Sequence, residues 1–176
     1  MPRMGDLLTL DEHKARLAAL TDVQSVWLSL ACAERLLARA SDEQRGVLRD
    51  ALDTAWDALA AADPARAASL AAVLEQRDDL DDDPVASVFF ALEAVAGVPD
   101  AAGWGAARGI DDAFERVPYP DGATEFRPLE EDTATETVQL ELRWQVQAAD
   151  VASQAATSED VRAWVQQQPS PGVDQP

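Results

Sequence analysis

Apolar residues recur every three to four positions along most of the chain, a spacing that gathers them on one face of an α-helix. The clearest stripe consists of Leu48, Leu52, Ala55, Trp56 and Leu59. Ser41 precedes this stripe and has Gln44 three positions later, the spacing of a capping box, in which both side chains bond free amides at a helix start. The sequence therefore predicts a helix that starts after Ser41 and buries the stripe.

The same signals divide the rest of the chain into helices. Asp63-Pro64 and Asp83-Pro84 each combine a capping residue with a proline suited to the first helical turn, and Gly97 is suited to end a helix. The predicted helices cover residues 9–20, 21–40, 41–59, 64–74, 85–96, 100–117, 130–156 and 158–167. We therefore expect an all-α, single-domain bundle of about seven to eight helices over residues 1–168, followed by a disordered tail over 169–176.

Two predicted helices carry conflicting signals. Gly103, Gly105 and Gly109 weaken the helix over 100–117. In the segment 137–147, apolar residues alternate with polar ones at 138, 140, 142, 144 and 146, which is typical of a strand. A helical stripe also runs through Leu140 and Trp144. Because no other segment alternates, a strand here would lack a partner. We therefore favour one long helix over 130–156, although the choice between helix and strand for 137–147 stays open at this point. Between these two helices, residues 120–122 predict a turn.

Composition supports a helical protein and adds a strong negative charge. Of the 176 residues, 47% are hydrophobic, and 14 basic residues face 33 acidic ones, for a net charge of −19. Unspecific nucleic-acid binding is disfavoured because phosphate contacts need Lys and Arg. Most of the excess lies after residue 77, and such a field attracts basic partners. The candidate acidic partner surface consists of Asp78, Asp79, Asp81, Asp82, Asp83, Glu130, Glu131 and Asp132.

The expected compartment follows from what the sequence lacks. No apolar run approaches the roughly 20 residues that cross a bilayer, and the N-terminal stretch lacks the apolar core of a secretory signal. The single cysteine, Cys32, cannot form an intramolecular disulfide. We expect a cytoplasmic protein with no membrane partner; whether it forms a homo-oligomer stays open.

The most suggestive charged residues are a Glu34-Arg35 pair and the cluster of Asp53 and Asp57. Neighbouring residues point about 100° apart on a helix, so Glu34 and Arg35 need partners elsewhere. Asp53 and Asp57 are like charges four residues apart, which favours a cation between them. We expect Arg35 to reach Asp53 or Asp57 in a structural ion-pair cluster. The alternative is a metal or general-acid site formed by Glu34, Asp53 and Asp57.

Other catalytic and cofactor chemistry finds little support. Cys32 lies between two alanines in the middle of a predicted helix, so we interpret it as a buried small hydrophobe. His13 is the only histidine, which excludes the usual Cys/His zinc set and leaves a catalytic triad without support. No P-loop or calcium-loop spacing is complete. We expect no cofactor, and we expect Trp104, Trp144 and Trp164 to be anchors of the core or of an interface.

Four stretches, "WLSLACAERLL", "LRDALDTAWDAL", "VFFALEAV" and "LELRWQVQAADVA", resemble, in this order, the YjaG-like family of bacterial proteins. The similarity spans residues 17–156 and is most specific at Glu34-Arg35 and at Asp53, Trp56 and Asp57. Typical members carry cysteine beside the Glu-Arg pair, where this chain has Ala33. The resemblance implies an all-helical fold and no assigned activity.

These observations favour a non-enzymatic helical protein that binds a protein partner through its acidic C-terminal surface. A sharper form of this hypothesis is an acidic inhibitor or immunity protein that neutralises a basic toxin such as a nuclease. The alternative from another class is an enzyme or metal-binding protein that uses the carboxylates of Glu34, Asp53 and Asp57.

Overall fold

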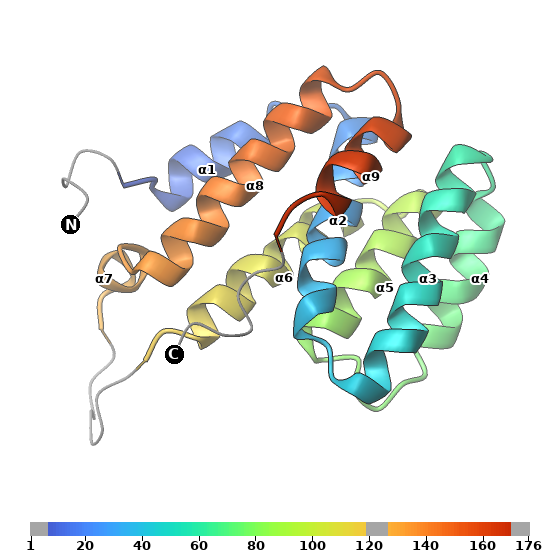
Figure 1. Ribbon diagram of the computed structural model, residues 1–176, viewed down its shortest axis with the longest axis horizontal. Coiled ribbons are helices and arrows are strands. Elements are labelled where there is room, and N and C mark those ends of the chain that lie inside the picture. The colour runs from blue at the N-terminus through green and yellow to red at the C-terminus, as the bar shows by residue number, and fades with distance from the viewer. Residues whose placement is uncertain (1–6, 119–126, 170–176) are drawn as a thin grey trace.

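A computed structural model describes residues 7–118 and 127–169, and in these ranges it contains nine α-helices and no strand (Figure 1). The all-α bundle is therefore confirmed, and residues 137–147 are helical. The helices are α1 (Leu10–Leu17), α2 (Asp22–Leu36), α3 (Asp42–Ala60), α4 (Pro64–Leu74), α5 (Asp83–Ala96), α6 (Ala101–Glu115), α7 (Leu129–Thr133), α8 (Glu136–Gln154) and α9 (Ser158–Gln166). A short 3₁₀ turn, η1 (Leu37–Arg39), extends α2.

Most helices start where local chemistry predicts. Capping boxes begin α1, α2, α3 and α9, with Thr9, Thr21, Ser41 and Thr157 as their N-caps. The Asp63 side chain accepts a hydrogen bond from the Arg66 amide at the start of α4. Helix α5 starts before its predicted position, because Asp82 is the N-cap and Asp83 is already helical. Gly97 ends α5 with φ of 87°, a backbone conformation that glycine adopts without strain.

The prediction of one helix over 130–156 is wrong, because the chain breaks between α7 and α8. The Thr133 hydroxyl donates to the Leu129 carbonyl and the Thr135 hydroxyl to the Asp132 carbonyl, both at 2.7 Å. Thr135 is extended, with ψ of 149°, and is the N-cap of α8. Side-chain bonds of this kind compete with the helical ladder. Leu140, which the predicted stripe placed inside, is 55% exposed.

Helix α2 lies at the centre of the bundle and packs against α3, α5, α6, α8 and α9. In Figure 1, α3 and α4 lie on one side of it and α8 and α1 on the other. The five residues Ser29–Ala33 are all buried, and most are small, so neighbouring helices can approach closely. Burial raises the pKa of the Cys32 thiol well above its usual value, and the nearby Glu141 charge adds to this effect. Cys32 is therefore a buried small residue, as predicted.

Two glycines of α6 are sites of close helix contact. A Cβ atom at Gly109 would lie 2.7 Å from Glu141 Oε1 and 2.9 Å from Gln145 Nε2 of α8. A Cβ atom at Gly105 would meet the Ser29 hydroxyl of α2. Gly103, in contrast, has open space around it. The glycines that weaken α6 as an isolated helix thus include two that let it approach α2 and α8.

The predicted turn at 120–122 and the tail beyond Pro169 lie outside the described residues. Within the described ranges, none of the helices combines the length and the apolar character that a bilayer crossing requires.

Candidate functional site

The Glu34-Arg35 pair of α2 points toward two different helices. Arg35 Nε donates to Glu141 Oε2 of α8 at 2.8 Å, and its guanidinium lies 4.5 Å from the centre of the Trp144 ring. The prediction that Arg35 reaches Asp53 or Asp57 is therefore wrong. The angular offset between neighbouring helix positions explains the result, because it directs Glu34 toward α3 and Arg35 toward α8.

Glu34 is the buried end of an ion-pair ladder. Its side chain is 5% exposed and receives both terminal nitrogens of Arg49 of α3, at 3.0 and 2.7 Å. The Trp56 indole nitrogen donates to the same carboxylate at 3.0 Å. Both oxygens of Glu34 are thus bonded, which satisfies a buried carboxylate that would otherwise be costly.

Asp53 and Asp57 do have a cation between them, as expected, but it is Arg162 of α9. Arg162 lies 2.8 Å from Asp53 and 3.3 Å from Asp57, and Asp53 also lies 3.5 Å from Arg49. The ladder joins α2, α3 and α9. The four-residue spacing of Arg49 and Asp53 could have been recognised in the sequence, whereas nothing in the sequence indicates Arg162.

The carboxylates proposed as an alternative metal or acid site are thus engaged by arginines. No group of three or more His, Cys, Asp or Glu side chains within residues 7–118 and 127–169 is arranged to hold a metal ion.

A second buried network, which sequence reasoning missed, continues from Arg35 into the protein. Glu141 accepts from Gln145 Nε2 at 3.1 Å, and Gln145 Oε1 lies 3.0 Å from His13 Nε2 of α1. Gln145 Nε2 also donates to the Ala106 carbonyl of α6 at 2.9 Å. Burial lowers the pKa of His13. The network joins α1, α2, α6 and α8 through side chains that are mostly sequestered from solvent.

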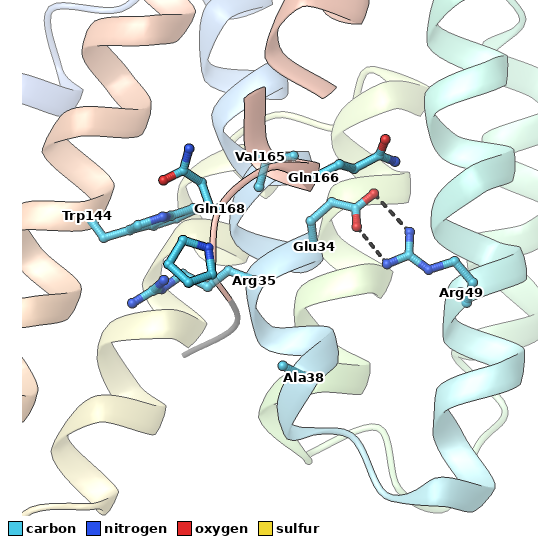
Figure 2. Close-up of a pocket in the computed structure, with 9 residues that line it drawn as sticks. Glu34, Arg35, Ala38, Arg49, Trp144, Val165, Gln166 and Gln168 are labelled. Carbon is cyan, nitrogen blue, oxygen red and sulfur yellow. Dashed lines mark hydrogen bonds and ion pairs between the residues drawn. The ribbon is translucent and has the colours of Figure 1, made fainter. Parts of the chain in front are cut away.

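A cavity of about 240 Å³ lies beside these two networks, and we call it the Trp144 pocket (Figure 2). It is bounded by α2, α3, α8 and the end of α9. Its walls include Glu34, Arg35, Arg49, Trp144, Gln166 and Gln168. In Figure 2 the Glu34–Arg49 pair closes one side, and Trp144, Arg35 and Gln168 gather on the other.

A larger hollow, of about 540 Å³, lies where the α4–α5 connection meets the C-terminal half of α6, and we call it the acidic hollow. Five carboxylates line it, from Asp81, Asp82, Asp83, Asp112 and Glu115. Gln44 of α3 donates to Asp82 at 2.8 Å and to Asp79 at 2.9 Å. These bonds fix the α4–α5 connection against the start of α3.

Charges in the acidic hollow influence one another. Burial raises the pKa of Asp83 to about 6, and the charge of Glu115 adds to this effect. Asp112 is bonded by Arg116 at 2.8 Å, and Arg39 Nε lies 4.0 Å away. Burial and the charge of Arg116 lower the pKa of Arg39. The hollow thus concentrates acidic groups that interact with one another and with a small number of arginines.

The predicted acidic surface is divided into two separate groups. Asp78 is exposed, and Asp79 is bound by Arg77 at 2.7 Å, which lowers the pKa of Asp79 to about 2. Glu130 and Glu131 are exposed on α7, and the neighbouring Asp132 is buried and paired with Arg127 at 3.1 Å. Figure 1 shows α7 far from the α4–α5 connection. The eight predicted acids therefore do not form one continuous contact surface.

The tryptophans singled out by the sequence differ in their environments. Trp144 is 8% exposed and stacks on Trp164, with ring centres 5.8 Å apart. Trp104 is 50% exposed and packs edge-on against Phe90 of α5, with ring centres 5.5 Å apart. Trp144 therefore belongs to the core beside the Trp144 pocket, whereas Trp104 lies at the surface.

Comparisons with models of known protein families, with curated proteins and with solved structures give no match to this chain. The resemblance to the YjaG-like family stays a prediction.

Proposed function

We propose that this protein acts by binding a basic partner protein, with a Lys or Arg side chain of the partner in the acidic hollow. The observation that supports this function is the concentration of five carboxylates around one concave surface. A cation that enters a concave site meets several carboxylates at once, with low-dielectric walls on either side. The net charge of −19 would also speed the approach of a basic partner at low salt.

The carboxylates of the acidic hollow divide into held and available groups. Gln44 binds Asp82, Arg108 lies 3.5 Å from Asp83, and Arg116 binds Asp112. In the described part of the chain, no hydrogen bond or ion pair reaches the exposed side chains of Asp81 and Glu115. These two carboxylates are free to make new contacts on binding. An inhibitor or immunity protein for a basic toxin is one specific form of this function.

The test compares two double variants that remove the same charge. The probe is a labelled octapeptide of alternating Lys, Arg and Gly residues, and fluorescence anisotropy reports its dissociation constant. Asp81→Asn with Glu115→Gln should weaken binding about tenfold, since exposed ion pairs contribute about 0.2–1 kcal/mol each. The control, Glu130→Gln with Glu131→Gln on α7, should change it less than twofold.

Equal weakening in both double variants would show that the peptide responds only to net charge, and it would contradict a specific role for the acidic hollow. Binding that does not change with added salt would contradict the electrostatic basis of the proposal.

A further inference from the structure

Trp144, which lines the Trp144 pocket, has a buried hydrogen-bond donor without an acceptor. Trp144 is 8% exposed, and its indole nitrogen is buried and has no hydrogen-bond partner in the part of the chain that the structure describes. Arg35 lies over one region of the ring, and Trp164 stacks on it. These contacts hold the ring in place. A buried N–H group without a partner costs about 1–3 kcal/mol, so an acceptor that reached Trp144 would recover stability.

Arg35 supplies further donors to the same pocket. Its side chain is 14% exposed, and its Nε is committed to Glu141. Neither terminal nitrogen of Arg35 donates a hydrogen bond to residues 7–118 or 127–169, although the guanidinium as a whole is paired with Glu141. In Figure 2 the Arg35 guanidinium and the Trp144 ring lie on the same side of the pocket. Indole and guanidinium groups only donate hydrogen bonds, so both require an acceptor.

The one carboxylate that lines the pocket does not oppose an incoming anion strongly. Both Glu34 oxygens are already bonded, to Arg49 and to Trp56. Arg35 and Arg49 together carry more positive charge into the lining than Glu34 offsets. Arg35 is also paired with Glu141, and Arg49 with Glu34, so these four charges balance. A ligand would therefore be held by hydrogen-bond donors and not by a net positive charge, which favours a small acceptor group with at most one negative charge.

We propose that the Trp144 pocket is a binding site for a small oxyanion, held by the Trp144 indole N–H and the terminal nitrogens of Arg35. The shared ligand chemistry is a singly charged oxygen acceptor group, either a carboxylate or a phosphate. The cavity volume of about 240 Å³ suits a small metabolite and excludes a folded partner. This site is independent of the acidic hollow, so the two proposals can fail separately.

The indole N–H groups provide a direct test by nuclear magnetic resonance. The chain has 5 tryptophans, and a Trp144→Phe variant identifies the Trp144 signal in an amide correlation spectrum. Acetate, propionate and inorganic phosphate are titrated separately into the full chain at constant ionic strength, with chloride as the balancing ion. We expect a saturable shift of the Trp144 signal in the millimolar range for at least one oxyanion. The exposed Trp104 should not respond.

The oxyanion that gives saturation distinguishes a carboxylate site from a phosphate site. Arg35→Lys keeps a charge beside Glu141 but loses the planar fork of donors, so it should weaken oxyanion binding about tenfold. Arg162→Lys removes the fork from an arginine of the ion-pair ladder outside this pocket and should leave binding unchanged.

Three outcomes would overturn the proposal. The first is a Trp144 signal that none of the anions shifts more than chloride does. The second is equal affinity in wild type and Arg35→Lys. The third concerns Gln168, which lies beside Trp144 in Figure 2 and donates to the Trp164 carbonyl at 3.3 Å. If Gln168→Ala moves the Trp144 signal and anions do not, Gln168 is the acceptor in solution.

Discussion

Gly103 and Gly109 are two glycines of one helix that lie in very different surroundings. Both lie in α6, and both lower its intrinsic helix propensity. Gly109 faces the buried ends of Glu141 and Gln145, which Arg35, His13 and the Ala106 carbonyl hold in place. Gly103 faces open space. Helix propensity is the same for both glycines, so it is the close contact with α8 that makes glycine necessary at position 109 and not at position 103.

We predict that Gly109→Ala destabilises the protein by about 1–3 kcal/mol, because the new methyl group would push on side chains that cannot move freely. Gly103→Ala, the matched control, should stabilise it by about 0.5–1 kcal/mol through helix propensity alone. Urea denaturation followed by circular dichroism measures both changes. A stabilising effect of Gly109→Ala would show that Glu141 and Gln145 move aside without cost.

At the scale of elements, α1 depends on few contacts. It packs against α8, and His13 is its only buried residue. His13 bonds to Gln145, and just before the helix, Leu8 exchanges two backbone-to-side-chain bonds with Gln139, at 2.9 and 2.8 Å. Elements with few buried contacts open at lower free energy than the core. Helix α1 should therefore detach from the bundle before the longer helices α2 and α3.

We predict that His13→Ala speeds hydrogen exchange of the α1 amides at least tenfold, since it removes the buried contact with Gln145. The amides of α2 and α3 should exchange at nearly unchanged rates. Lys14→Ala, an exposed change on the same helix, serves as the control and should have no such effect. Faster exchange throughout α2 and α8 would mean that α1 does not open as a separate unit.

At the scale of the whole molecule, Asp83 and His13 make stability depend on pH in opposite directions. Burial raises the pKa of Asp83 from 3.8 to about 6, so the folded chain binds this proton more tightly than the unfolded chain. Its contribution makes stability fall as pH rises from about 4 to 6. Burial lowers the pKa of His13, so the unfolded chain binds that proton more tightly. The His13 contribution makes stability fall as pH drops below about 6.5.

We predict that Asp83→Asn removes the fall in stability that Asp83 causes as pH rises from about 4 to 6. The stability difference between variant and wild type should grow in favour of the variant by about 3 kcal/mol at most between pH 4 and 7, the free energy of a shift of about two pKa units. Urea denaturation at several pH values measures it. The Asp111 charge contributes less than burial and Glu115 to the raised Asp83 pKa, so Asp111→Asn should reproduce only a minor part of this pH-dependent difference. Parallel pH curves for wild type and Asp83→Asn would contradict a raised Asp83 pKa.

The prediction of separate helices succeeded because the signals that start and end them act within a few residues. Ser41 with Gln44, Pro64 after Asp63, and Gly97 each satisfy or release backbone groups next to them in the chain. The break before α8 is also local, but its signal, hydroxyl bonds of Thr133 and Thr135, is weak beside the apolar pattern. Local rules therefore predict where most helices lie, and the break between α7 and α8 is the one that they did not predict.

The partners of the charged residues could not be read from the chain in the same way. The sequence alone determined that Glu34 and Arg35 must point apart and that Asp53 and Asp57 need a cation. Only the tertiary structure decided that Glu141 binds Arg35 and that Arg162 bridges the two aspartates, over separations of 106 and 109 residues. Helix periodicity is a property of adjacent residues, whereas these pairs, the Trp144 pocket and the acidic hollow exist only where distant helices pack together.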